Sequence, residues 1–521
     1  MTSRIASAAL LLAAAAAFAS SALAQTMQEP RITYHAQIVD PATNRFEVRI
    51  HVTGERLGPE NDVLQFAATA PGTYQIMDIG RFVENLEARD ADGNLMPMER
   101  ITTNQWRISD PSRLREIKYQ IAETWDTAVE EHPIYPMAGT SIEADHVLFN
   151  AHAVLGLIEG LQDTPTRLDL GVPQEWTIGT ALERDAAGFF PAEDYDFLVD
   201  SPILAGLSVT VATTEVTGVP IEIYTYSAQG SIRSEMLLES MQSMLEAAGA
   251  FLGGLPVDRY VFLYHFEGAP AQGASYGAWE HSYSSEYVFP EVPWSEGYGA
   301  LIKDVAAHEF LHIVTPLNIH SEIIETFDFE TPTPSRHLWL YEGVTEWGSH
   351  MSQLRAGIKS PEAYLEEMAQ KIAVDRQRFD AQTSLEELAL TSYTDEGHTQ
   401  YGNIYMRGAL VAGLLDIRLL ELSGGERDLQ DLLLALMERY GKNDPFQDAE
   451  LYEVLVGMTD PAIAEFFESY VRNAEPLPYA EYYGKLGIDF VDGDPAQPGF
   501  VIGTDPTPEQ ALLRAAWMGA R

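Results

Sequence analysis

The spacing of the hydrophobic residues changes once along the 521-residue chain, and this change limits the folds open to it. Between residues 31 and 226 apolar and polar residues alternate, as in Phe46, Val48 and Ile50, which is the period-two pattern of β-strands. From Ser231 onward the spacing becomes that of helices. A chain of this length is too long for one hydrophobic core. We therefore predict an α+β multidomain protein, with an all-β amino-terminal domain followed by a mostly helical one.

The predicted boundaries divide the chain into four segments. Residues 1–24 have the features of a signal peptide, with Arg4, an apolar run and the cleavage pattern Ala22-Leu23-Ala24. The β-rich domain is predicted at 25–227, a helical domain with a small sheet at 228–475, and a carboxy-terminal tail at 476–521. Cleavage of the signal would place the mature chain in the periplasm or outside the cell. No later stretch has 18 apolar residues without a charge, so no transmembrane segment is expected in the mature chain.

The composition excludes several classes of function. The chain has no cysteine, which rules out thiolate metal sites, catalytic thiols and disulfides, and leaves His, Asp and Glu as the strong metal ligands. Its 32 basic and 78 acidic side chains give a formal charge of −46, which would repel a phosphate backbone. Nucleic acid is therefore not an expected partner, and any metal must be held by imidazoles and carboxylates.

A metal-binding pattern lies in the helical part of the chain. His308 and His312 are four residues apart within a segment that has a helical spacing of apolar residues. Residues four apart lie on one face of a helix, so both imidazoles can reach one zinc ion. Glu309 would then lie beside a zinc-bound water, where a carboxylate can act as general base. A pentapeptide of this kind also occurs by chance, so the pattern needs a second element.

That second element is the segment from Leu338 to Trp347, which is predicted to be a helix. It carries Glu342, thirty residues after His312. Two imidazoles and one carboxylate leave a fourth zinc position open for water, as a catalytic site requires. Glu346 follows one turn later and could accept a hydrogen bond from the free ring nitrogen of a zinc-bound histidine, although a solvated helix carboxylate is the alternative.

A competing pattern suggests a serine hydrolase. Gly273-Ala274-Ser275-Tyr276-Gly277 fits the nucleophile elbow, in which the serine lies on a sharp turn between a strand and a helix. Here the predicted strand ends several residues earlier, and no convincing helix follows. The zinc site is therefore the favoured interpretation.

With these residues in place, the chain resembles the glycyl aminopeptidase family of zinc metallopeptidases. Gly277-Ala278-Trp279-Glu280-His281 stands where that family has a Gly-Ala-Met-Glu-Asn type strand, whose glutamate binds the free α-amino group of the substrate. The resemblance implies that Gly277, Ala278 and Glu280 bind substrate. Tyr405 begins a Tyr-x-Arg-Gly segment whose tyrosine stabilises the oxyanion in the family, with a packing role as its alternative. The resemblance also implies a thermolysin-like catalytic domain with one zinc ion per chain.

The chain departs from the family in two places. After His312 it continues with Ile313-Val314-Thr315-Pro316 rather than with Trp-Asn and basic residues, so a preference for glycine is not implied. Fewer than 45 residues follow Leu477, too few for the PDZ domain that ends many members, so we expect a tail without a complete PDZ domain.

We therefore predict a zinc aminopeptidase that hydrolyses peptides from a free amino terminus. Two alternatives remain open: an endopeptidase or oligopeptidase of the same zinc class, and a non-catalytic homologue that binds peptides. The sequence predicts neither the preferred first residue nor the oligomeric state.

Overall fold

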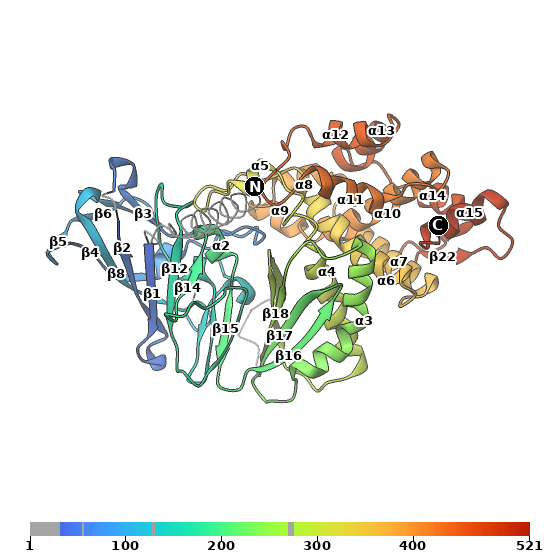
Figure 1. Cartoon of the computed structure of the whole chain (residues 1–521). Coiled ribbons are helices and arrows are strands. Elements are labelled where there is room, and N and C mark those ends of the chain that lie inside the picture. The colour runs from blue at the N-terminus through green and yellow to red at the C-terminus, as the bar shows by residue number, and fades with distance from the viewer. Residues whose placement is uncertain (1–31, 55–56, 128, 130, 269–275, 521) are drawn as a thin grey trace, which may run out of the picture.

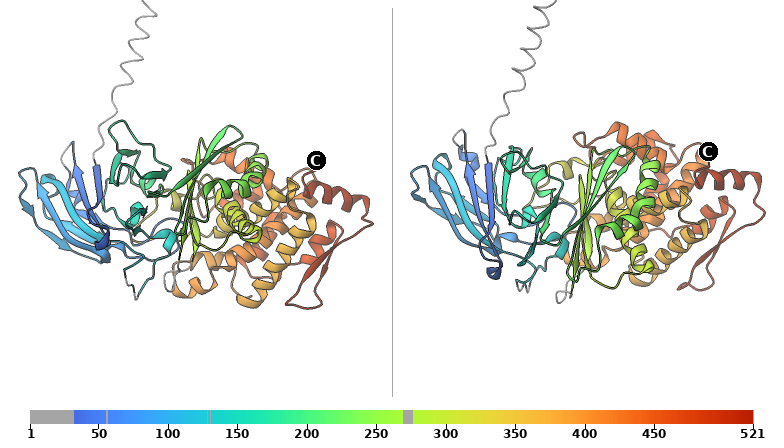
Figure 2. Two further views of the ribbon diagram at one scale, coloured as in Figure 1. Left: turned by 90° about the horizontal axis from the view of Figure 1, so that it is seen from below. Right: turned by 60° about the horizontal axis from the view of Figure 1, so that its bottom comes forward.

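A computed structural model of the chain describes residues 32–54, 57–127, 129, 131–268 and 276–520. A β-rich part occupies one end of the molecule and a helical part the other, with a second sheet between them (Figures 1 and 2). This order confirms the predicted fold class. The predicted signal peptide lies outside the described residues. Among the helices that are described, none is long and apolar enough to cross a membrane.

The β-rich part contains three sheets. The largest has seven strands in the order β14 (Phe190–Ala192), β12 (Thr166–Gly171), β1 (Ile32–Ile38), β2 (Arg45–Val52), β8 (Leu114–Ala122), β4 (Val83–Asp90) and β5 (Leu95–Met96). One four-stranded sheet is formed by β11 (Leu157–Ile158), β3 (Val63–Gln65), β7 (Gln105–Ile108) and β6 (Met98–Arg100), and the other by β13 (Thr177–Thr180), β15 (Ile203–Gly206), β10 (His146–Phe149) and β9 (Ser141–Ile142). Alternate residues of β2 and β12 are buried, as the period-two pattern predicts.

A separate five-stranded sheet begins the second part of the chain. Its order is β16 (Thr210–Val216), β17 (Val219–Ser227), β18 (Tyr260–Glu267), β20 (Ser284–Pro290) and β19 (Gly277–His281). The β17, β18 and β20 strands run parallel, and β19 is the antiparallel strand at the edge. The predicted boundary at residue 227 therefore falls after β16 and β17, which belong to this sheet and not to the preceding ones, since β16 pairs with β17 and β17 with β18. Alternation alone gives the strands but does not show which sheet they join.

Helices cover this sheet and form the rest of the molecule (Figure 1). The helices are α3 (Ser234–Leu252), α4 (Glu296–Leu311), α5 (Glu322–Glu325), a π-helical segment η7 (Trp339–Val344), α6 (Thr345–Arg355), α7 (Pro361–Arg378), α8 (Leu385–Leu390), α9 (Asp395–Gln400), α10 (Asn403–Ser423), α11 (Leu429–Arg439), α12 (Leu451–Met458) and α13 (Ile463–Phe467). The α7 helix begins as predicted, because the Ser360 hydroxyl accepts a hydrogen bond from the backbone N–H of Ala363 and Pro361 is its first residue.

The carboxy-terminal segment packs on the helical part. It contains α14 (Tyr479–Lys485), the hairpin β21 (Ile488–Val491) and β22 (Gly499–Ile502), and α15 (Pro508–Trp517). The indole of Trp517 is 1% exposed and its ring lies 5.4 Å from that of Tyr364. These residues therefore belong to the core of the helical part.

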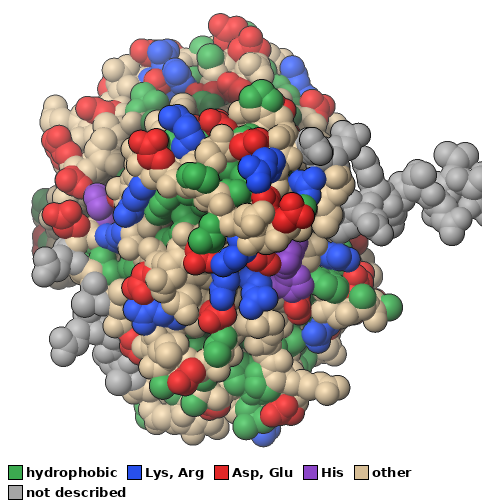
Figure 3. Space-filling view, turned by 90° about the vertical axis from the view of Figure 1, so that its left-hand side faces the viewer, with side chains coloured by type: hydrophobic (Ala, Val, Ile, Leu, Met, Phe, Trp, Pro, Cys, Tyr) green, Lys and Arg blue, Asp and Glu red, His purple; other side chains and the backbone are tan. Residues whose placement is uncertain are grey.

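A third apolar cluster joins the two parts of the molecule. Leu148 and Leu204 of the β-rich part pack with Val261, Leu263 and Val288 of the five-stranded sheet. The β-rich part thus lies against this sheet and reaches the site described below. Figure 3 shows the end of the β-rich part that points away from the helices. Basic side chains gather near the centre of this face, with acidic side chains around them.

Candidate metal centre and substrate cleft

Helix α4 holds the two predicted histidine ligands. The N-cap of this helix is Ser295, whose hydroxyl accepts a hydrogen bond from the backbone N–H of Tyr298. The helix ends at Leu311, and His312 is its C-cap residue. The Nε2 atoms of His308 and His312 lie 3.1 Å apart. The Nδ1–H of His312 donates a hydrogen bond to the backbone oxygen of Thr315 at 2.9 Å. The lone pair of Nε2 is therefore free to bind a metal ion.

Glu342 completes a three-ligand group with these histidines. Its Oε2 lies 3.3 Å from Nε2 of His308 and 3.5 Å from Nε2 of His312. Two ligand atoms that are each 2.0–2.1 Å from a tetrahedral ion lie about 3.3–3.4 Å apart. The three side chains are also almost completely buried. Their arrangement therefore fits a zinc ion with one position left open, without movement of the chain.

The residues after Glu342 explain its position. The predicted helix from Leu338 to Trp347 is present, but its turns over Trp339–Val344 are π-helical before it continues as α6. A Cβ added at Gly343 would lie 2.6 Å from the Cα of Gly408 in α10, so only glycine allows this approach. Such π-helical turns are frequent at functional sites. Here the turn and the two glycines bring Glu342 and α10 together.

Glu346 forms a hydrogen bond with Nδ1 of His308, the ring nitrogen that does not face Glu342. Its Oε2 lies 2.8 Å from Nδ1 of His308, while its Oε1 contacts Nζ of Lys371 and lies 3.2 Å from Nε2 of His350. Burial opposes a charge on His308, but hydrogen bonds to Glu342 and Glu346 outweigh it and hold its pKa well above the usual value. The carboxylates thus create a strong preference for positive charge at the centre of the site.

Glu309 and Glu280 face the same space. Burial, with the neighbouring Glu342, raises the pKa of Glu309 to about 7, a suitable value for a group that takes and returns a proton near neutral pH. One carboxylate oxygen of Glu280, one of Glu309 and a ring nitrogen of His312 lie within 4.8 Å of one another. Burial, followed by the charges of Glu342 and Glu309, also holds the pKa of Glu280 well above its usual value. Glu280 is 9% exposed and forms no hydrogen bond or ion pair with another described side chain.

The strand β19 places Glu280, and the β-rich part supports it. Gly277 and Ala278 precede Glu280 on this edge strand, and Ala278 and Glu280 line the cavity around the histidines. Gly72, from the β-rich part, has a φ of +77°, and a Cβ added there would lie 2.6 Å from Oε1 of Glu280. The indole Nε1–H of Trp279 donates to the backbone oxygen of Pro71 at 3.0 Å. Both parts of the chain therefore form the cleft.

Tyr405 enters the cleft from the first turns of α10. Its ring lies 5.4 Å from that of His308, and its hydroxyl lies 3.4 Å from the hydroxyl of Tyr401. Burial raises the pKa of Glu342, but the hydrogen bond to His308 and the charges of both histidines, with a smaller contribution from Tyr405, lower it overall. The phenol is thus beside the metal ligands, where a neutral donor could reach a substrate oxygen.

Ser275, the candidate serine nucleophile, lies outside the described residues. Sequence reasoning missed Lys371, which lies on α7 and shows only as one lysine of an amphipathic helix. It also missed a second cavity of about 260 Å³ that shares Gly72, Trp279 and Glu280 with the metal centre. No motif marks that cavity, because its walls come from segments far apart in the sequence.

Two histidines and one glutamate with closely spaced ligand atoms, and a further buried glutamate beside them, form an arrangement typical of metallopeptidases. Sequence profiles described as the Peptidase M61 N-terminal domain and M61 glycyl aminopeptidase match residues 33–207 and 302–411. The chain belongs to this peptidase family.

Solved structures show the same fold. An aminopeptidase N family protein from Idiomarina loihiensis is 20% identical, with a TM-score of 0.76 over 88% of this chain and 79% of that chain. A mutant of an M1 zinc metallopeptidase from Deinococcus radiodurans, solved with a bound Tyr-Ser-Ala substrate, is 13% identical, with a TM-score of 0.53 over 86% of this chain and 94% of that chain. Among proteins with curated descriptions, none matches the chain.

Proposed function

We propose that the protein is a zinc aminopeptidase that removes the first residue of peptides. The observation that carries this proposal is the spacing of the ligand atoms of His308, His312 and Glu342, which are 3.1–3.5 Å apart. A zinc ion held by them would polarise the scissile carbonyl and lower the pKa of a bound water towards 7. One ion per chain accounts for all three ligands.

Glu309 and Tyr405 supply the proton transfer and the oxyanion donor. Glu309 accepts a proton from the attacking water as its oxygen bonds to the carbonyl carbon. When the carbon–nitrogen bond breaks, Glu309 returns this proton to the leaving amine. The Tyr405 hydroxyl donates a hydrogen bond to the oxygen that becomes negative in the transition state. Glu346 keeps the His308 ring oriented during both steps.

Glu280 is the proposed anchor for the substrate amine. In a peptide, the nitrogen of the first residue lies about 2.5 Å from that residue's carbonyl carbon. A carboxylate that binds the ammonium must therefore lie within a few ångströms of the general base. Glu280 meets this condition, since its carboxylate is within 4.8 Å of the donor atoms of Glu309 and His312. Gly277 and Ala278 would line the path of the peptide along β19.

An endopeptidase or oligopeptidase of the same zinc class is the second candidate. The cavity beyond Glu280 favours it, because residues ahead of the scissile bond could occupy that space. The aminopeptidase is preferred, because a buried carboxylate without a partner is unfavourable unless it meets a cation. A free amino terminus brings that cation to Glu280.

The experiment that tests the proposal compares free and N-acetylated substrates. Aminoacyl 4-nitroanilides and their acetylated forms would be incubated with the full chain, with and without a zinc chelator. We expect hydrolysis of the free amines, loss of activity with the chelator, and poor cleavage of the acetylated forms. Equal cleavage of both forms would select the endopeptidase, and zinc binding without any turnover would select a non-catalytic peptide-binding homologue.

The remaining parts of the proposal follow from the sequence. Residues 1–24 would be removed as a signal peptide, which places the protein in the periplasm or outside the cell. Residues 25–227, 228–475 and 476–521 would form the β-rich domain, the catalytic domain and the tail. Peptides are the proposed partners, and the charge of −46 argues against nucleic acid.

A further inference from the structure

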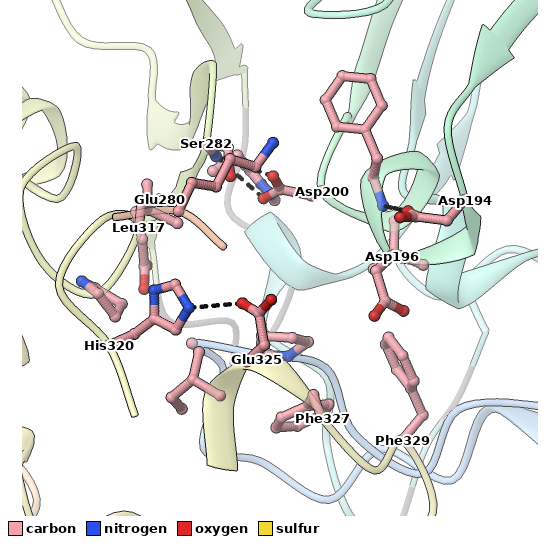
Figure 4. A pocket seen from close by; sticks show the side chains of 18 of the residues that line it. Asp194, Asp196, Asp200, Glu280, Ser282, Leu317, His320, Glu325, Phe327 and Phe329 are labelled. Atoms are coloured by element: carbon pink, nitrogen blue, oxygen red, sulfur yellow. Dashed lines mark hydrogen bonds and ion pairs between the residues drawn. The ribbon is translucent and has the colours of Figure 1, made fainter. Parts of the chain in front are cut away.

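The cavity beyond Glu280 has a composition that points to its occupant. It has a volume of about 260 Å³ and shares Gly72, Trp279 and Glu280 with the metal centre, so the two spaces meet at the amine anchor. Besides Glu280, six carboxylates line it: Asp163, Glu193, Asp194, Asp196, Asp200 and Glu325. Figure 4 shows four of these, Asp194, Asp196, Asp200 and Glu325. Lys442 is the one lysine or arginine among the described lining residues, and it lies 3.6 Å from Glu193.

Three of the carboxylates lie together around the short helix α2 (Tyr195–Val199) and accept hydrogen bonds from neutral donors. Asp194 accepts from the backbone N–H of Phe197, Asp196 accepts from Nε2 of Gln162, and Asp200 accepts from the backbone N–H of Ser282. None of the three forms an ion pair with a described lysine or arginine, while Oδ1 of Asp200 lies 3.3 Å from Nδ1 of His281. Burial, with the charges of the other aspartates, raises the pKa of Asp196 to about 7. The cavity therefore holds negative charge that a positive group would stabilise.

The shape of the site favours an organic cation over a metal ion. Among the described residues, two sets of three His or Glu side chains have ligand atoms within 4.8 Å of one another, and both sets include His312. The carboxylates of the acidic cavity form no such set, so they are too far apart to enclose one metal ion. The cavity also has apolar walls, including Phe197, Phe327, Phe329 and the indole of Trp279. A cavity lined by both apolar side chains and carboxylates suits a long aliphatic chain that ends in a positive charge.

The position of the cavity relative to Glu280 identifies which part of a substrate enters it. This step rests on the proposed function, in which Glu280 holds the amine of the first residue. The side chain of that residue leaves the same Cα as the amine, so it must enter space that adjoins Glu280. The cavity around the histidines is taken by the scissile bond. Glu280 also lines the acidic cavity, which is therefore the space open to the side chain of the first residue.

We propose that the acidic cavity binds the side chain of a substrate whose first residue is arginine or lysine. Phe327 and Phe329 contact its aliphatic part, and Asp196 and Glu325 attract its charge. Glu325 accepts a hydrogen bond from Nε2 of His320 at 2.7 Å, so its carboxylate is held at the cavity wall. The enzyme would thereby prefer basic residues over glycine.

The test compares lysyl and norleucyl 4-nitroanilides, because norleucine has the four-carbon chain of lysine without the ammonium. The assay uses the full chain loaded with zinc at pH 8, where Asp196 is ionised. We expect kcat/KM to be at least about tenfold higher for the lysyl substrate, since an opposite charge in a partly dehydrated cavity is worth at least that factor. Arginyl 4-nitroanilide should behave as the lysyl substrate does.

Substitutions then assign the preference to the cavity. The Asp196→Asn and Glu325→Gln double variant should lower the lysyl-to-norleucyl ratio of kcat/KM several-fold, because it removes the charges that attract the lysyl ammonium. Asp328→Asn is the matched control, because Asp328 lies on the loop between Phe327 and Phe329 but does not line the cavity. Its ratio should equal that of the wild type. A wild-type ratio near one, or a ratio that survives the double substitution, would overturn the inference.

A binding measurement separates this inference from the proposed function. If the protein hydrolyses glycyl, alanyl and norleucyl substrates but does not favour lysine, the aminopeptidase stands and the inference fails. If no substrate is hydrolysed, the proposed function fails, and calorimetry with lysinamide and norleucinamide decides on the cavity. We expect lysinamide to bind at least about tenfold more tightly, and equal affinities would refute the assignment.

Discussion

Replacing Glu280 with glutamine removes the proposed amine anchor with little change in shape. Glu280 is 9% exposed and has no partner among the described side chains, so the substrate ammonium would be its one strong interaction. Loss of one partner from a buried charge pair costs about 2–5 kcal/mol, which corresponds to about 30-fold to several thousand-fold in kcat/KM. We expect the lower part of that range, because burial raises the pKa of Glu280 and substrate binding must also ionise it.

The assay is a double cycle with alanyl 4-nitroanilide and its acetylated form. Acetylation removes the same charge from the substrate, so the two changes together should cost much less than the sum of their separate effects. Glu286→Gln is the control on the neighbouring strand. Glu286 is fully buried, burial holds its pKa well above the usual value, and its partner is Asn150. This variant should stay within about twofold of wild type, because glutamine also presents an uncharged polar end.

Two results would refute this reasoning. The first is a Glu280→Gln variant that keeps the wild-type rate on the free amine. The second is an equal loss on free and acetylated substrates, which would assign Glu280 to the structure of the cleft rather than to the amine.

Three further changes test other parts of the account. Tyr405→Phe should lower kcat by about 10²–10³ with little change in KM, and an unchanged kcat would leave Tyr405 with a packing role only. Gly408→Ala should lower both the melting temperature and turnover, because the added Cβ would lie 2.8 Å from the Cα of Gly343. Gly413→Ala is the control, since a Cβ there has its nearest neighbour at 3.7 Å. Equal effects of the two substitutions would argue against the close contact. The free energy of unfolding should fall as the pH drops from about 6.5 towards 3, because burial lowers the pKa of His152 to about 3 and only the unfolded state binds the proton in that range. His152 contributes a slope of at most about 1.4 kcal/mol per pH unit. Denaturant titrations in which His152→Gln leaves this slope unchanged would contradict the prediction.

Local patterns in the sequence were enough to predict that His308, His312 and Glu342 lie close together. His308 and His312 share a helix face because of their spacing alone. Glu342 followed from a second apolar segment that carries this glutamate thirty residues after His312. The contact between Glu346 and His308 could be expected because residues one helical turn apart share a face. The order of a β part and a helical part also followed from the change in hydrophobic period.

Features that depend on distant segments could not be predicted in this way. The pairing of β17 with β18 and the π-helical turn at Glu342 are set by packing, the latter against Gly408. The approach of Gly72 to Glu280 joins residues that are more than 200 positions apart. Asp196 lies in a stretch without any motif, and it shares a cavity with Phe327 and Phe329 because distant segments fold together.

The most direct test of the central claim is to measure zinc content and turnover together in the wild type and in Glu309→Gln. Glutamine keeps the size of the side chain but cannot accept the proton of the attacking water. Because Glu309 is not one of the three ligands, both proteins should carry about one zinc per chain, while Glu309→Gln loses nearly all hydrolysis of aminoacyl 4-nitroanilides. A wild-type protein without zinc, or a Glu309→Gln variant with wild-type turnover, would contradict the account.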